Sequence, residues 1–337
     1  MDSFQNYWSH KVLLFSSNLD HKLSGTSEEN LSVVDRNKRV PYPSNTIQPP
    51  SSNSDIKKIR NEETYSASLK LDEFFKDETH LDTTNRSYIK LRSGFEYDRR
   101  GSSSLFYNVL ARIKLPKTQE KLQLYIGEDT QENTKLSTTQ NGANNEGVGL
   151  KYFIPSLYDR LFSSASIGVS RIDNPYAKAR IEYPLFIGNR LFKPTQNFKL
   201  SLDNRFEEWT NLYIDRKISD QEILRLLLQR STRSGVIGMN YLSQLSYMNT
   251  LNYGIGFNHY LALSGRTKDL TGTLYANGTT PQAGVYEYTV GTLWRQKIFR
   301  DYLFYQLQPM ISFHEQYDYM PNYIFRISME LYFGNNR

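Results

Sequence analysis

The chain contains no cysteine, which excludes disulfide bonds and thiolate metal sites. It also lacks long apolar runs, since stretches such as Val12 to Phe15 end after a few residues. A membrane-spanning helix needs roughly 18 consecutive apolar residues. The mean hydropathy is low, at −0.61. A protein that crosses a membrane with helices is therefore not expected.

The sequence also lacks the common motifs of catalysis and cofactor binding. There is no phosphate-binding loop, no dinucleotide fingerprint and no zinc-ligand spacing. The 5 histidines are all more than four residues apart, namely His10, His21, His80, His259 and His314. Because metal sites gather their ligands, we expect neither a metal nor a cofactor. The net charge of +6 is too modest to indicate nucleic acid, and none is expected as a partner.

Aromatic residues are abundant for so polar a chain. It has 25 Tyr, 18 Phe and 3 Trp, which together make 14% of 337 residues. A transmembrane β-barrel accounts for this combination, because it has an apolar outer band, aromatic girdles at both interfaces and a polar lumen.

The side chains beyond residue 86 alternate with the period of a β-strand. In 88–98, Ile89 and Leu91 fall on one face and Lys90 on the other, and 323–333 shows the same alternation. Successive side chains of a strand point to opposite faces, so each strand has one apolar and one polar side.

The pattern predicts an all-β fold, a single closed antiparallel transmembrane β-barrel over 87–334. We expect about 14 strands, with 12 or 16 as alternatives. The fourteen candidates are 87–99, 104–115, 121–128, 147–154, 160–171, 176–186, 196–207, 209–218, 222–234, 238–248, 252–264, 285–298, 302–314 and 322–333. The two longest junctions, 129–146 and 266–284, fall on the same side, as expected of extracellular loops opposite short periplasmic turns.

Residues 1–86 are expected to form a mostly disordered periplasmic extension. Its linker, 25–63, is too polar to bury much surface. We expect one short helix near the start, and another at 66–76 that docks at the periplasmic mouth through Leu71, Phe74 and Phe75. The first residues lack the basic start and apolar core of a signal peptide. Since a barrel must be exported, we expect the signal to have been removed or missed.

The chain resembles a family of uncharacterised proteobacterial outer-membrane β-barrel proteins over about residues 66–334. The resemblance is carried by Leu71-Asp72-Glu73-Phe74-Phe75, Ser87-Tyr88-Ile89-Lys90-Leu91-Arg92, Leu115-Pro116, Ser264-Gly265-Arg266-Thr267, Phe299-Arg300-Asp301-Tyr302-Leu303-Phe304-Tyr305, Gln308-Pro309 and Arg326-Ile327-Ser328-Met329-Glu330-Leu331-Tyr332-Phe333-Gly334. The resemblance implies a bacterial outer-membrane location and an architecture. It implies no activity.

One residue pair suggests an enzyme. Ser243 and His259 both fall on the predicted lipid-facing side of adjacent strands, where a lipid hydrolase could place a nucleophile and its base. No third residue on that face would orient the histidine. Catalysis is therefore less favoured than the two functions given below, and we expect no enzyme.

The predicted inner face is rich in charge, with thirteen basic and eight acidic residues. The basic residues are Lys90, Arg92, Arg112, Lys114, Lys151, Lys178, Arg180, Lys199, Arg205, Lys217, Arg295, Lys297 and Arg326. The acidic residues are Glu96, Asp98, Glu182, Asp203, Glu207, Asp215, Glu287 and Glu330. The predicted lipid-facing residues include Ile89, Leu91, Ile181, Leu200, Leu202, Ile327 and Leu331.

Two functions account for this inner face. A narrow diffusion channel would use the basic excess to favour small anionic solutes. A non-conducting structural or interaction barrel would fill its lumen with cross-strand ion pairs. Either barrel would have outer-membrane lipid, lipopolysaccharide and the barrel-assembly machinery as partners, and residues 1–86 could bind a periplasmic protein.

Overall fold

A computed structural model describes residues 2–24, 53–75, 87–101, 103–115, 122–127, 147–154, 161–170, 174–251, 254–270, 275, 278 and 280–334. The elements are α1 (Asp2–Ser24), α2 (Asn53–Phe75), β1 (Tyr88–Asp98), β2 (Ser104–Leu115), β3 (Leu122–Gly127), β4 (Gly147–Ile154), β5 (Phe162–Ser170), β6 (Asn174–Glu182), β7 (Leu185–Ile187), β8 (Arg190–Ser201), β9 (Arg205–Ser219), β10 (Glu222–Arg233), β11 (Asn240–Leu251), β12 (Ile255–Arg266), β13 (Gly284–Lys297), β14 (Leu303–His314), η2 (Glu315–Tyr317) and β15 (Pro321–Gly334). Neither described helix is long and apolar enough to cross a membrane.

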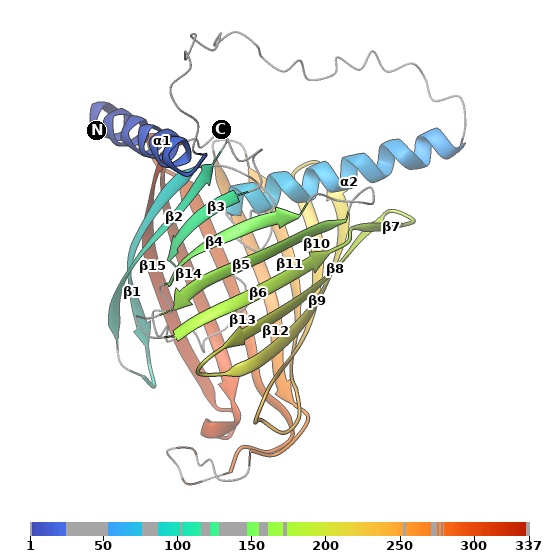
Figure 1. Ribbon diagram of the computed structural model, residues 1–337. Coiled ribbons are helices and arrows are strands. Elements are labelled where there is room, and N and C mark those ends of the chain that lie inside the picture. The colour runs from blue at the N-terminus through green and yellow to red at the C-terminus, as the bar shows by residue number, and fades with distance from the viewer. Residues whose placement is uncertain are drawn as a thin grey trace.

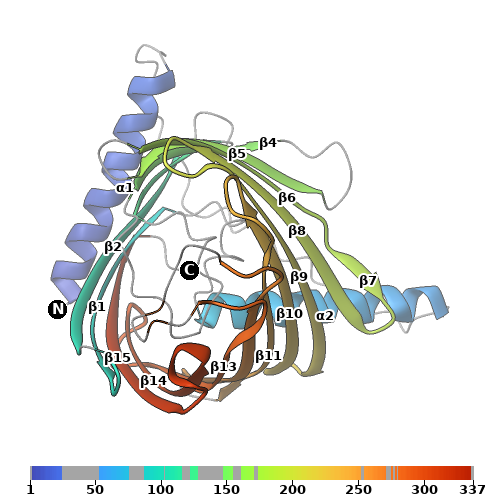
Figure 2. The ribbon, with the colours of Figure 1, turned by 90° about the horizontal axis from the view of Figure 1, so that it is seen from below.

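The strands form one closed antiparallel barrel (Figures 1 and 2). β1 pairs with β15, where Ile89 lies opposite Phe333. β6 pairs with β8, where Ala179 lies opposite Phe198, and this pairing completes the ring. β7 pairs with β8 alone and lies outside the ring, which therefore has 14 strands. The predicted fold, strand number and closure of the last strand onto the first are confirmed.

The barrel is apolar outside and polar inside. Along β15 exposed and buried residues alternate: Phe325 and Ile327 are exposed, whereas Arg326 and Ser328 are buried. This inverts the pattern of a soluble protein, and lipid is the solvent that suits such an exterior. The protein is an outer-membrane β-barrel, and the bacterial outer membrane is where this architecture resides.

The two ends of the barrel differ in their connections. β9 and β10 are joined by a turn between Ser219 and Glu222, and β13 and β14 by one between Lys297 and Leu303. The long connection between β12 and β13 lies at the other end, while both helices lie at the short-turn end (Figure 1). Short turns are typical of the periplasmic side of such barrels, so we call the end that carries the helices the periplasmic mouth and the other end the extracellular mouth. The predicted loop 129–146 lies outside the described residues.

One predicted strand was misplaced. The prediction of a strand over 196–207 is wrong, because β8 ends at Ser201 and β9 begins at Arg205, which adopts a left-handed φ of 53°. Leu202 and Asp203 lie in the turn and are exposed, and Arg205 is exposed at its end. Asp203 therefore lies in the turn rather than on the inner face. Arg205 lies at the rim, opposite the inward-facing Ser201, and Leu202 lies at the barrel end rather than within the apolar band. The alternation of polar and apolar residues continues through the turn with one interruption, the polar Asn204, and this concealed the turn in the sequence.

The N-terminal extension contains more helix than predicted. α2 begins at Asn53, so it takes in the end of the predicted linker 25–63 and all but the last residue of the predicted helix 66–76. The segment has neither glycine nor proline, and its Glu, Lys, Arg and Leu residues favour helix. Residues 25–52 lie outside the described residues. α1 packs on the outer surface of β15, β2 and β1.

Candidate functional site

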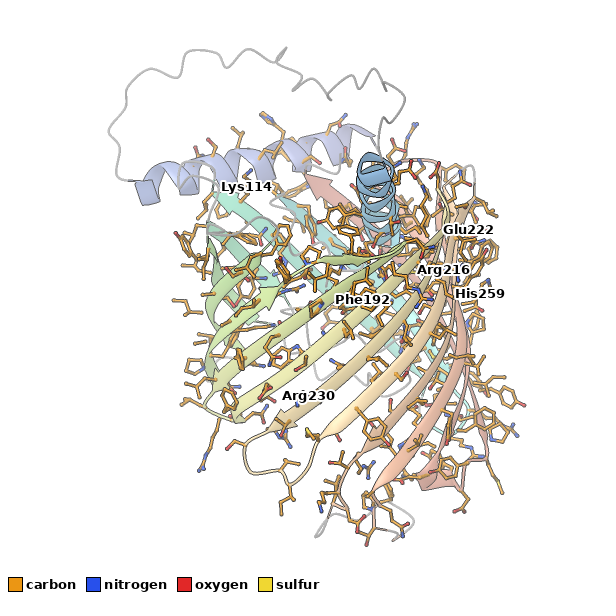
Figure 3. The ribbon with its side chains drawn as sticks, turned by 90° about the vertical axis from the view of Figure 1, so that its right-hand side faces the viewer. Lys114, Phe192, Arg216, Glu222, Arg230 and His259 are labelled. Atoms are coloured by element: carbon orange, nitrogen blue, oxygen red, sulfur yellow. The ribbon has the colours of Figure 1, made fainter. Side chains whose placement is uncertain are left out.

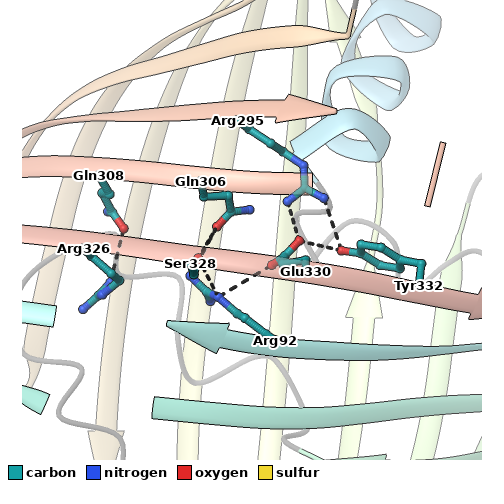
Figure 4. A network of polar contacts seen from close by, with 8 residues as sticks. All are labelled: Arg92, Arg295, Gln306, Gln308, Arg326, Ser328, Glu330 and Tyr332. Atoms are coloured by element: carbon teal, nitrogen blue, oxygen red, sulfur yellow. Dashed lines mark hydrogen bonds and ion pairs between the residues drawn. The ribbon is translucent and has the colours of Figure 1, made fainter. Parts of the chain in front are cut away.

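A network of charged and amide side chains lines the inner wall where β13, β14, β15 and β1 meet (Figure 4). The β1–β15 register sets Glu96 opposite Arg326 and Arg92 opposite Glu330. Arg326 Nε donates to Glu96 Oε2 at 2.6 Å, and Arg92 Nε lies 3.7 Å from Glu330 Oε1. Opposite charges thus face each other across the strands, as in other stable sheets.

Arg295 occupies the centre of this network and is fully buried. Its Nη1 donates to Glu330 Oε2 at 2.6 Å, and its Nη2 donates to the Tyr332 hydroxyl at 3.3 Å. The guanidinium also lies 4.3 Å from the ring centroid of Phe304. A buried guanidinium needs such partners, because an unpaired buried charge is strongly destabilising.

The opposite wall also pairs its charges, both within one strand and across strands, and adds aromatic rings. Arg180 forms an ion pair with Glu182, and Lys199 forms one with Glu207, with its Nζ 3.7 Å from Glu207 Oε2. Lys178 Nζ lies 5.1 Å from the ring centroid of Trp209. These contacts hold the long basic side chains against the wall.

Most of the predicted lumen residues lie on the inner face or at its rim. Those placed there are Lys90, Arg92, Glu96, Arg112, Lys114, Lys178, Arg180, Glu182, Lys199, Glu207, Glu287, Arg295, Lys297, Arg326 and Glu330. Arg205 lies exposed at the rim, and Asp203, in the turn, is the exception. The prediction missed three buried inner-face cations, Lys193, Arg225 and Arg266.

Arg225 is the most consequential of these omissions, because it attaches α2 to the wall. Its Nε donates to Asp215 Oδ1 of β9 at 2.7 Å, and its Nη1 donates to Asp72 Oδ1 of α2 at 2.7 Å. Ser68 of α2 donates its hydroxyl to Asp215 Oδ2 at 2.6 Å. We call Ser68, Asp72, Asp215 and Arg225 the latch. All four residues are at least 95% buried.

The end of α2 lies inside the periplasmic mouth (Figure 2). Leu71 and Phe75 form a buried cluster with Ile223 of β10, Met248 of β11 and Leu293 of β13. These wall residues face the lumen, so the helix reaches from one side of the mouth toward the other. The ring centroid of the neighbouring Phe74 lies 6.5 Å from that of Phe304 on β14. This placement agrees with the docking predicted for the end of the extension.

Several polar atoms of the inner wall have no hydrogen-bond partner among the protein groups that the structure describes. They are Asn197 Oδ1 and Nδ2, Trp209 Nε1, Asn211 Oδ1, Gln244 Oε1, Asn258 Oδ1 and Thr289 Oγ1. A buried polar atom without a partner costs about 1–3 kcal/mol. Because protein interiors avoid this cost, unpartnered atoms on a polar inner wall are candidates for hydrogen bonds to bound water.

The extracellular mouth holds a cavity of about 310 Å³ beside Trp209, Arg266 and Tyr286. Tyr275, in the connection that follows β12, is held there by two hydrogen bonds. Arg266 Nη2 donates to the Tyr275 hydroxyl at 3.0 Å, and that hydroxyl donates to Glu315 Oε1. Burial and then the Glu315 carboxylate raise the pKa of Tyr275 to about 12. No three His, Asp or Glu side chains within the described segments are arranged to hold a metal.

The structure does not bring Ser243 and His259 together. Ser243 lies opposite Leu263, whereas His259 lies opposite Tyr247, so the two are four positions apart, or about 13 Å along the strands. His259 is at the outer surface (Figure 3), with its Nδ1 2.9 Å from Thr292 Oγ1 and its ring stacked on Phe257. It belongs to an aromatic girdle rather than to a Ser–His pair.

No family model matches the chain. No curated protein matches it either. OprB of Pseudomonas putida has a TM-score of 0.48 and 8% identity, covering 76% of this chain and 97% of that one. The DcaP channel of Acinetobacter baumannii has a TM-score of 0.44 and 10% identity, covering 74% and 96%. A KdgM porin in complex with oligogalacturonate has a TM-score of 0.35 and 7% identity, covering 72% and 98%. At these TM-scores the likenesses carry no argument about activity.

Proposed function

We propose that the protein is a narrow outer-membrane diffusion channel for small solutes, with a weak preference for anions, and that α2 closes its periplasmic mouth. The observation that carries the proposal is the set of unpartnered polar atoms on the inner wall, which includes Asn197, Asn211 and Asn258. A barrel built only as a filled scaffold would gain stability by replacing them with apolar side chains.

The charge of the inner wall supports an anion preference. Basic side chains remain more numerous than acidic ones after the misplaced Asp203 is removed and Lys193, Arg225 and Arg266 are added. Charges that line a pore bias which ions enter it. Screening acts over about 8 Å at physiological salt, so the preference weakens as salt rises.

The position of α2 supports a closed resting state. Leu71 and Phe75 fill space among lumen-facing residues, and Asp72 shares Arg225 with the wall. If α2 leaves, Arg225 keeps Asp215 as its partner. The wall therefore does not depend on α2 to satisfy this cation, which is a property that a removable plug requires.

The alternative is a non-conducting structural barrel, and the fully buried Arg295 with its partners favours it. Swelling of proteoliposomes distinguishes the two functions. We expect wild-type protein to admit small anions slowly. In the Leu71→Ala variant, small anions should enter faster than cations of equal size. Lys70→Ala is the matched control, since Lys70 is exposed on the same helix. Absence of swelling with all three proteins would favour the structural barrel.

A further inference from the structure

α1 carries an exposed aromatic and apolar face that the channel proposal does not use. Tyr7, Trp8, Leu14 and Phe15 are 56%, 46%, 43% and 53% exposed. Soluble helices rarely present so many large apolar side chains together, so a patch of this kind marks a surface that contacts something else.

The helix is fixed to the barrel by its neighbouring face. Val12 is buried, and the Gly334 amide of β15 donates to Ser9 Oγ at 2.9 Å. α1 also packs against β2. On the outer side of β2, Ala111 and Ile113 are buried near the periplasmic end, whereas residues nearer the extracellular end are exposed. α1 therefore covers part of the barrel's outer surface.

α1 lies at the periplasmic edge of the apolar band. The outward side chains of β15 are apolar from Tyr323 to Phe333. For a tilted strand this length corresponds to about 25 Å, the height of the apolar band of such barrels. α1 crosses β15 next to Phe333, at Gly334. Its exposed face thus continues the surface that lipid already covers.

The polarity of α1 is divided between two sides. Trp8 and Phe15 are seven residues apart and share one side of the helix, beside the face that holds Val12. Asn6 and Ser17 are exposed on the opposite side. Lys11 Nζ lies 5.5 Å from the ring centroid of Tyr7, so its charge can reach headgroups while its stem packs on the ring. Leu13 is an apolar residue on the polar side.

We propose that α1 is an interfacial helix, which lies in the headgroup region of the periplasmic leaflet with Trp8 and Phe15 among the phospholipid acyl chains. Continuity with the apolar band and the adjoining barrel wall favour phospholipid over a soluble partner. Interfacial helices bind in this way, with one face in lipid and polar groups toward water. Tryptophan and tyrosine are the residues enriched at that depth.

Site-directed spin labelling tests this proposal, because the chain has no cysteine of its own. Single cysteines replace Phe15 or, as the matched control, Ser17 in the full-length protein, which is then placed in phosphatidylethanolamine–phosphatidylglycerol vesicles. Both positions are exposed, so neither change removes a buried contact. We expect the label at position 15 to collide with dissolved oxygen and not with a water-soluble nickel complex. The label at position 17 should show the reverse.

Two results would overturn the proposal. Equal access of nickel to both labels would place α1 in water, available to a periplasmic partner. Equal exclusion of nickel and oxygen from both labels would show that protein covers α1, as a second copy of the chain would. A second measurement avoids substitution at Phe15. In a protein whose Trp209 and Trp294 are replaced by phenylalanine, the quenching of Trp8 fluorescence by iodide is compared with its quenching by dibrominated lipids. We expect the lipids to quench more strongly.

Discussion

Leu71→Ala should release α2 from the periplasmic mouth. Leu71 is 1% exposed and packs against Ile223 and Met248. Loss of a buried leucine side chain costs about 2–5 kcal/mol, because the transfer energy and the cavity both count. Leu71 belongs to the helix and not to the wall, so the cost falls on docking. The undocked fraction should rise by about 30-fold to a few thousandfold, up to complete release.

A cysteine at Thr64 reports the undocked state. Thr64 is 2% exposed, lies two turns before Leu71 on the same side of α2, and is similar in size to cysteine. A charged, membrane-impermeant thiol reagent should modify Thr64→Cys in proportion to the undocked fraction. Addition of Leu71→Ala should accelerate modification, whereas addition of Lys70→Ala should not. Equal rates in the two double variants would refute the docking energetics.

Three further outcomes are expected. Val290→Arg, within the apolar band, should destabilise insertion by about 2–4 kcal/mol, whereas Leu202→Arg, in a turn, should have little effect; urea unfolding of the barrel in lipid vesicles measures both. Glu330→Ala should cost about 3–5 kcal/mol in the same assay, because it leaves Arg295 buried without its carboxylate, and replacing both by apolar residues should restore much of the loss. The pKa of Tyr275 is raised to about 12. The stability that its hydrogen bond to Glu315 contributes is therefore fully present below the ordinary tyrosine pKa of about 10 and is lost as pH rises through 12. An absorbance titration of Tyr275→Phe should lack one group that titrates near pH 12.

The closed barrel could be predicted from the sequence because alternation repeats in almost every strand. The β1–β15 closure is an example: apolar Ile89 and Phe333 face outward as partners, and Arg92 and Glu330 face inward as partners. A one-residue error in register would send each of these side chains to the wrong solvent. The apolar lipid outside and the polar lumen inside therefore favour the same β1–β15 register.

The turn at 202–204 shows where alternation fails as a guide. Ser201 and Glu207 have the polarity of one continuous strand, although the chain reverses between them. The backbone marks the turn through the positive φ of Arg205, and the sequence marks it only through Asp203 and Asn204, two residues that favour turns. No glycine follows them, so the strongest hairpin signals, asparagine–glycine and aspartate–glycine, are missing.

The latch could not be predicted, because its members come from distant parts of the chain. Arg225 and Asp72 are 153 positions apart, and only folding brings them together. Arg225 also lies among Leu224, Leu226 and Leu227, where an inward-facing leucine interrupts the alternation of polar and apolar residues. The apolar residues of α2 were visible in the sequence, but their ionic partner on the wall was not.

Single-channel recording in planar lipid bilayers tests the central claim most directly. Wild-type protein and Leu71→Ala should show the same unit conductance, with a reversal potential that favours chloride. The variant should be open for a much larger share of the time, because only the docking of α2 has changed. Equal open probabilities, or no current from either protein, would contradict a wet lumen that α2 closes.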